Sequence, residues 1–255
     1  RTPSQRALED RQTQVRDYYN FSVQQALVEV FDRYRGRPPS PEDTQGNFRL
    51  KTGRWTIGGR MTDVRLADDR LLPKELIPAA SLSFGGLRNQ YRRDGLGAEL
   101  VAVTAKRVVS KGSDEIPWSE TPFPAITAVA RFPGETLEQV LSTYQVEVIG
   151  YDPYRQDSVD MAGVQAPLAA NFTSGYGLWL ARSGFARQSL LTLVGRGEVL
   201  ERPHVYLLQP FDPDRRIVVM LHGLASSPEA WINVANEVLG DEELRRNYQI
   251  WQVYY

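Results

Sequence analysis

One stretch near the C-terminal end limits the fold of this chain more than any other. Five apolar residues, Ile217–Leu221, form a run of the kind that is buried on both faces of a sheet. A glycine-bearing segment, 222–225, follows this run. A helical pattern then continues to Gly240, and a second strand-like run occupies 249–254. A strand, a loop, a helix and a second strand in this order predict an α/β sheet.

The helix in this stretch has clear start signals. Ser226 precedes Glu229 by three positions, which matches the capping-box pattern, and Pro228 suits the first helical position. We therefore interpret Ser226 and Ser227 as capping residues of the helix rather than as nucleophiles.

The segment Ile217–Trp231, IVVMLHGLASSPEAW, resembles the strand-to-helix loop of α/β-hydrolase esterases and lipases, in which an apolar strand ends in His-Gly. The resemblance implies that the backbone N–H of Leu224 belongs to the oxyanion hole, which stabilises negative charge on the substrate oxygen. It also implies that His222 and Gly223 shape the loop. Gly223 lets the backbone approach the substrate closely because glycine has no Cβ.

The catalytic triad that the resemblance implies is incomplete in these residues. In this family the nucleophile lies in a G-x-S-x-G turn, with the acid and the base later in the chain. No G-x-S-x-G occurs here, and the only histidines are His204 and His222. We therefore expect the Ser, the Asp or Glu, and the His of the triad to follow Tyr255, in a C-terminal remainder of the same polypeptide. This chain alone is expected to be inactive.

The residues before this stretch show two other patterns. Apolar residues at three- and four-residue spacing over 4–34 predict a helix that docks on the neighbouring domain, with a membrane-facing surface as the alternative. Short β-like runs then predict a sandwich or a curved antiparallel sheet, with a short helix at 136–144. The clearest of these runs are 54–57, 100–109, 125–131, 144–149 and 177–181.

The predicted fold class is therefore α/β: the start of an α/β-hydrolase sheet, preceded by a β-rich, sandwich-like domain with an N-terminal helix. The predicted divisions are a helical segment at 1–45, a β-rich accessory domain at 46–185 and the N-terminal portion of the hydrolase domain at 186–255. Within the last portion, the strands at 204–208 and 217–221 are expected to pair antiparallel, before the sheet turns parallel.

Composition excludes several classes of function. The net charge of −1 lacks the basic excess that is typical of nucleic-acid binders. Without cysteine, the 255 residues contain no disulfide, thiolate metal site or cysteine nucleophile. We predict no metal site, because the aspartates fit turn capping better than calcium binding. They are Asp152, Asp157, Asp160, Asp212 and Asp214.

The resemblance implies a cofactor-independent serine hydrolase that acts on carboxylic esters, with lipid-like esters as the expected substrates. A membrane surface is a further possible partner. Alternatives are a non-catalytic binding protein on a hydrolase-like scaffold, an acyltransferase of the same fold and an enzyme of two associated chains. The family resemblance, the lack of cysteine and a first residue other than Met suggest a periplasmic or outer-envelope location, with secretion as the alternative.

Overall fold

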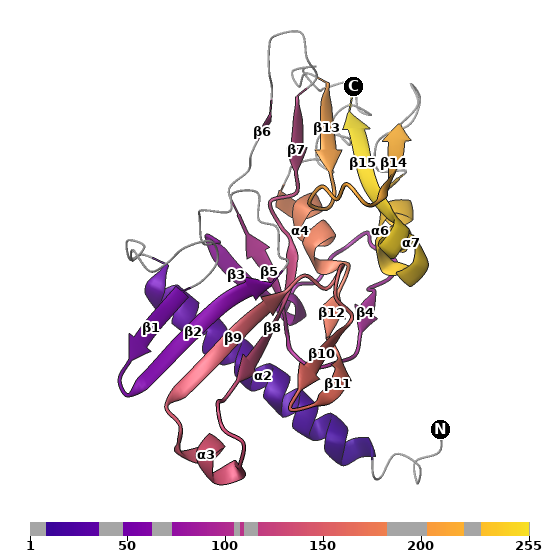
Figure 1. Cartoon of the computed structure of the whole chain (residues 1–255). Helices are drawn as coiled ribbons and strands as arrows, with labels where there is room; N and C mark the ends of the chain where they lie inside the picture. The colour runs from indigo at the N-terminus through magenta and orange to yellow at the C-terminus, as the bar shows by residue number, and fades with distance from the viewer. Residues whose placement is uncertain are drawn as a thin grey trace.

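The chain forms a mixed α/β structure with a curled mixed sheet and a long helix near its N-terminus (Figure 1). This computed structural model describes residues 9–35, 48–62, 73–104, 108–109, 117–182, 203–221 and 231–254. Two sheets of five and six strands dominate it, and two pairs of short strands complete the β structure of the described residues.

The first sheet is built from the middle of the chain. Its strand order is β1-β2-β9-β8-β5-β3, in which β2 and β9 are parallel and every other neighbouring pair is antiparallel. The predicted strands at 54–57, 125–131 and 144–149 all lie in it. The strands are β1 (Phe48–Thr52), β2 (Trp55–Thr62), β3 (Glu75–Pro78), β5 (Ala98–Val103), β8 (Ala125–Arg131) and β9 (Gln145–Tyr151).

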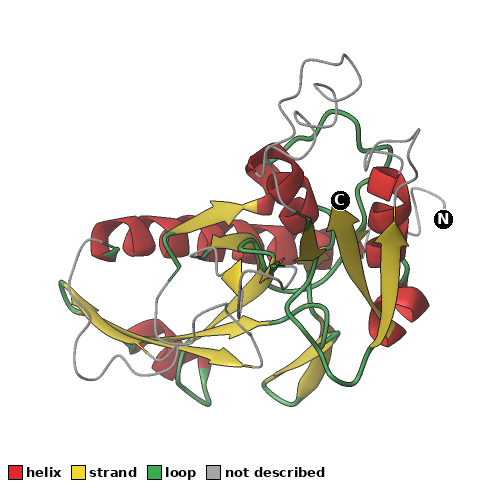
Figure 2. Ribbon diagram, turned by 90° about the horizontal axis from the view of Figure 1, so that it is seen from above, coloured by secondary structure: helices red, strands yellow, loops and turns green. Residues whose placement is uncertain are grey.

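Helix α2 (Glu9–Tyr34) covers one face of the first sheet, which confirms the docking predicted from its periodicity. Val23 and Leu27 are buried against the sheet. The Tyr19 hydroxyl donates to the Ala130 carbonyl at 2.6 Å and accepts from the Ala130 N–H at 2.9 Å. Figure 2 shows α2 along one side of this sheet. A helix therefore occupies the face on which a sandwich would place a second sheet.

The second sheet joins strands from two distant parts of the chain. Its order is β14-β15-β13-β7-β6; the pairs β14–β15 and β13–β7 are parallel, and β13–β15 and β6–β7 are antiparallel. The strands at 204–208 and 217–221 were expected to be neighbours, but β15 lies between them. The strands are β6 (Val108–Val109), β7 (Trp118–Glu120), β13 (His204–Leu207), β14 (Arg216–Leu221) and β15 (Tyr248–Tyr254).

Strand β14 is buried on one face only, so the prediction of burial on both faces was wrong. Ile217, Val219 and Leu221 are 43%, 53% and 55% exposed, whereas Met220 is 3% exposed. Met220 faces the core shared with helix α6 (Ile232–Gly240), which connects β14 to β15 together with helix α7 (Glu242–Asn247). Among the described residues, no element covers the opposite face of β14 in the same way.

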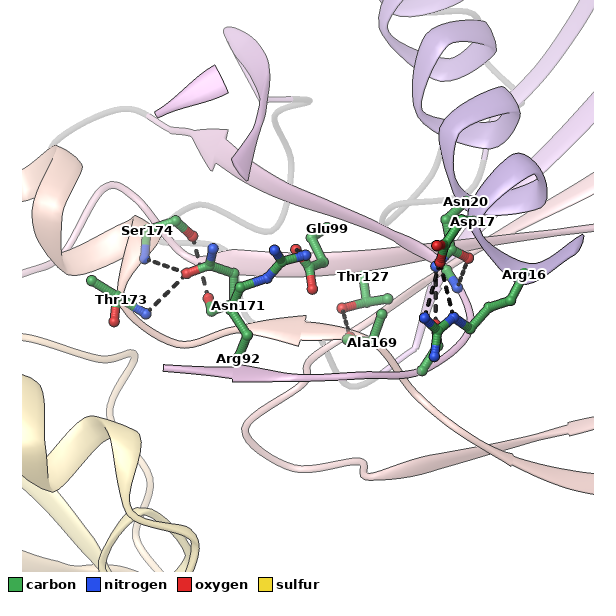
Figure 3. A network of polar contacts seen from close by, with 12 residues as sticks. Arg16, Asp17, Asn20, Arg92, Glu99, Thr127, Ala169, Asn171, Thr173 and Ser174 are labelled. Carbon is green, nitrogen blue, oxygen red and sulfur yellow. Dashed lines mark hydrogen bonds and ion pairs between the residues drawn. The ribbon is translucent and has the colours of Figure 1, made fainter. Parts of the chain in front are cut away.

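The predicted strand at 177–181 is instead helix α4 (Ser174–Arg182). Its residues are buried on every side of the helix. The sequence therefore has no apolar periodicity that would distinguish a helix from a strand. The Asn171 side-chain oxygen begins the helix by accepting the N–H groups of Thr173 at 3.2 Å and Ser174 at 2.9 Å (Figure 3). A Cβ on Gly177 would lie 2.5 Å from the Phe84 ring, so this helix packs closely where glycine allows it.

The remaining elements are short. The predicted helix at 136–144 is α3 (Leu137–Ser142), with a capping box between Thr136 and Gln139. The others are β4 (Arg92–Arg93), β10 (Ser158–Met161), β11 (Val164–Pro167), β12 (Ala170–Asn171) and the 3-10 helix Ala79–Ser81.

A common core links the predicted accessory segment to the predicted hydrolase segment. Val101 and Trp179 of the former belong to the same buried cluster as Met220, Leu239 and Ile250 of the latter. Strand β7 also comes from the accessory segment, yet it pairs with β13. The predicted boundary near residue 185 lies outside the described residues, and the division into domains stays a prediction.

Candidate functional site

The predicted oxyanion-hole loop lies between β14 and α6. His222, Gly223 and Leu224, with the capping residues Ser226 and Ser227, are all outside the described residues. The two elements that flank the loop are described. They place its start at the carboxyl end of β14, which runs parallel to β15. In α/β sheets, ligands bind outside the carboxyl ends of the parallel strands.

A hydrogen bond joins the two flanks of this loop. The indole Nε1 of Trp231, next to the start of α6, donates to the carbonyl oxygen of Leu221, the last residue of β14, at 2.9 Å. The indole N–H thus gives the carbonyl at the end of this strand a hydrogen-bond partner. This contact fixes the points at which the loop leaves and rejoins the described fold.

Helix α6 is held in place by a buried polar cluster. Asn236 is 1% exposed; its side-chain oxygen accepts from the Thr173 hydroxyl at 2.9 Å, and its amide donates to the Asn89 carbonyl at 2.8 Å. The helix ends at Gly240, as predicted, and a Cβ there would lie 2.1 Å from the Tyr91 ring. These contacts bind α6 to the start of α4 and to the loop before β4.

The second histidine, His204, forms a buried pair with a serine. The hydroxyl of Ser119 on β7 lies 2.9 Å from Nε2 of His204 on β13, and the two residues are 2% and 8% exposed. His204 pairs with Tyr254 of β15, next to the pairing of Val253 with Leu221. The Ser–His pair therefore lies at the same end of the sheet as the start of the predicted loop.

A serine hydrogen-bonded to a histidine is the arrangement of an activated nucleophile. Here, however, the burial of Ser119 keeps its hydroxyl from a substrate in the described structure. The His204 ring also packs against Tyr206, with centroids 4.4 Å apart, so the pair lies within the aromatic core of the second sheet. Sequence analysis missed this pair, because Ser119 and His204 lie 85 positions apart and no motif joins them.

The prediction that aspartates cap turns is confirmed for three of the five. Asp152 accepts the Tyr154 N–H at 2.8 Å, Asp160 accepts the Gly163 N–H at 3.2 Å, and Asp212 accepts the Asp214 N–H at 3.1 Å. Asp157 instead forms an ion pair with Arg246 at 2.5 Å. Within the described ranges, no cluster of His, Asp and Glu side chains has the arrangement of a metal site.

Ion pairs connect the turn after β9 to the turn before β14. Asp212 contacts Arg155 at 2.6 Å and Arg215 at 3.4 Å. Burial alone would raise the pKa of Asp212, but the Asp214 N–H and the Arg155 guanidinium lower that pKa below its ordinary value. Burial raises the pKa of Asp152, beside this group, to about 6. The cluster joins the two sheets next to the core.

No protein-family model, curated protein or solved structure matches this chain. Among the helices that the structure describes, none is long and apolar enough to cross a bilayer.

Proposed function

We propose that the second sheet belongs to a serine hydrolase that cleaves carboxylic esters, with lipid-like esters as its substrates. The observation that carries this proposal is the unit β14–α6–β15: two parallel strands joined through a helix, with the His-Gly-Leu segment between the first strand and the helix. This unit supports the proposal because the segment begins at the carboxyl end of a parallel strand, and hydrolases of this type bind the scissile carbonyl at that edge of the sheet.

The proposed chemistry is acyl transfer to water without a cofactor. A serine Oγ attacks the ester carbonyl, its proton passes to a histidine, and the carbonyl oxygen becomes an oxyanion that the Leu224 N–H stabilises. Collapse releases the alcohol, which takes the proton from the histidine. Water then cleaves the acyl-enzyme by the same steps. The proposed nucleophile, acid and base lie outside residues 1–255.

Two related functions share this support. An acyltransferase would use the same loop, with an acceptor alcohol in place of the water that cleaves the acyl-enzyme. A binding protein on the same scaffold is favoured by one observation, the uncovered apolar face of β14, because large exposed apolar surfaces mark interaction sites. An envelope location and contact with a membrane surface remain proposals; Tyr18 and Phe21 of α2, at 72% and 60% exposed, would be available for such contact.

The test compares the 255-residue chain with the complete product of its gene. Each is incubated with a fluorophosphonate probe and with p-nitrophenyl esters of increasing acyl length. We expect the gene product to label and turn over, and the 255-residue chain to do neither. Labelling of neither protein would rule out the hydrolase and leave the binding function.

Two substitutions separate the proposed loop chemistry from general damage. Leu224→Pro removes the backbone N–H, and we expect kcat of the gene product to fall about 10²- to 10³-fold. Leu224→Ala keeps that N–H and is expected to reduce kcat much less. Equal losses in both variants, at equal thermal stability, would contradict the oxyanion role of Leu224.

Ser119→Ala tests the competing nucleophile. Because Ser119 is buried, we expect the labelled serine to be unaffected by this substitution. Labelling of the 255-residue chain that disappears in Ser119→Ala would instead make Ser119 and His204 the reacting pair.

A further inference from the structure

A small cavity lies where the two sheets meet, at the start of α4 and the end of β13. Its volume is about 20 Å³, and its wall includes Thr121, Asp152, Tyr176 and Gln209. Asp152 follows β9 of the first sheet and Gln209 follows β13 of the second, so the cavity has polar groups from both. The cavity lies at the opposite end of β13 from His204.

Two buried polar atoms of the residues that line this wall have no hydrogen-bond partner among the described residues. They are the hydroxyl of Tyr176 and Nε2 of Gln209, and both residues are 3% exposed. The orientation of the Gln209 amide is fixed, because its oxygen accepts the Ile250 N–H at 2.9 Å. Nε2 is therefore the free end, and it can only donate. Buried polar atoms without a partner are costly, so such atoms usually meet an ordered molecule.

The charges around the cavity restrict what can bind. The Asp152 carboxylate, one oxygen of which accepts the Tyr154 N–H at 2.8 Å, disfavours an anion. The Gln209 Nε2 donor disfavours a cation, which has no lone pair to offer it. A volume of about 20 Å³ has room for one water-sized molecule.

We propose that this cavity binds a single uncharged, water-sized molecule that both accepts and donates hydrogen bonds, which is water. It accepts from Gln209 Nε2, exchanges a hydrogen bond with the Tyr176 hydroxyl and donates to the Asp152 carboxylate. The water thereby bridges the first sheet, the second sheet and α4 at the point where their cores meet.

The sign of one substitution tests this proposal. Tyr176→Phe removes only the hydroxyl. If the cavity is dry, the substitution deletes an unsatisfied polar group and raises Tm; if water is bound, it deletes a hydrogen bond and lowers Tm. We expect a decrease of about 2 to 4 °C. Tyr154→Phe is the matched control, because the Tyr154 hydroxyl donates to the Phe172 carbonyl at 3.0 Å and its loss lowers Tm in either case.

A crystal structure at high resolution shows directly whether the cavity holds a water. If it disagrees with the Tm change of Tyr176→Phe, the crystal structure decides. We expect one water peak within hydrogen-bond distance of Tyr176 Oη and Gln209 Nε2. An empty cavity, or a chloride identified by its anomalous scattering, would overturn the proposal.

Discussion

Asp152 and Asp212 lie in the two turns that the ion-pair cluster connects, and their pKa values shift in opposite directions. Burial raises the pKa of Asp152 to about 6. Burial acts on Asp212 in the same sense, but the Asp214 N–H and the Arg155 guanidinium outweigh it, so the pKa of Asp212 falls. Asp212, which contacts Arg155, is therefore stabilised in its ionised form, whereas Asp152 is stabilised in its protonated form.

These shifts predict a pH dependence of stability. The folded pKa of Asp152 lies above that of an unfolded aspartate, so its stabilising contribution is present below about pH 4 and is lost as pH rises through about 6. We expect Asp152→Asn to remove that loss, which is about 2 to 3 kcal/mol. Urea denaturation of both proteins from pH 4 to pH 7 measures the difference.

Asp212→Asn is the opposite control. The lowered pKa of Asp212 gives stability that is present at neutral pH and is lost as pH falls through that pKa. The variant should therefore be less stable than the parent at pH 7 and approach it in acid. A parallel pH profile for Asp152→Asn and the parent would show that Asp152 titrates normally.

The indole of Trp231 offers a test of the flank of the predicted loop. Trp231→Phe keeps an aromatic ring but removes the donor to the Leu221 carbonyl, and we expect a loss of about 1 kcal/mol in unfolding free energy. Trp251→Phe is the matched control, since within the described part of the chain the Trp251 Nε1 has no hydrogen-bond partner. Similar losses in the two variants would show that ring volume, and not the hydrogen bond, matters at Trp231.

Helix α2 contributes to the core through a narrow stripe. Leu27 is 9% exposed against the first sheet, whereas Phe21, six positions earlier on the same helix, is 60% exposed. We expect Leu27→Ala to cost about 2 to 5 kcal/mol and Phe21→Ala less than about 0.5 kcal/mol. Chemical denaturation of the two variants compares the costs. A comparable cost at Phe21 would indicate a partner on the outer side of α2.

The sequence predicted those elements that can be recognised from the pattern of neighbouring residues alone. The period of α2 was found because its buried residues lie on one face, and β8 was found because it is a short apolar run between turn residues. The helix α4 was missed because its residues are buried on all sides. The capping roles of Asp152, Asp160 and Asp212 could be predicted, since a turn aspartate acts on its own neighbours.

Features that depend on distant partners could not be predicted. The exposure of Val219 depends on whether another element covers β14, which the apolar run itself does not reveal. Likewise, the Ser119–His204 pair requires the parallel pairing of β7 with β13. In the sequence, the only indication of this pair was that His204 had been given no role. The oxyanion role of Leu224 stays a prediction.

In the described part of the chain, the two sheets leave the outer apolar face of β14 open. Ile217, Val219 and Leu221 project from the outer face of β14, whereas parallel sheets normally have both faces covered. We expect Val219→Lys to reduce the binding of a hydrophobic dye and light scattering by the 255-residue chain, with little change in Tm. Val218→Lys, on the partly buried inner face, should lower Tm instead. Unchanged dye binding in Val219→Lys would place the apolar surface elsewhere.

The pairing of β7 with β13 also has a consequence during protein synthesis. Ser119 and His204 are 85 positions apart. A ribosome that adds roughly 5 to 20 residues per second joins His204 about 4 to 17 s after Ser119. The strand pairing of the first sheet and its packing on α2 involve no residue beyond Tyr151, so this part of the fold can form on the nascent chain during the interval. Strand β7 is without its partner β13 during this interval. The second sheet is complete only after β15 has been synthesised.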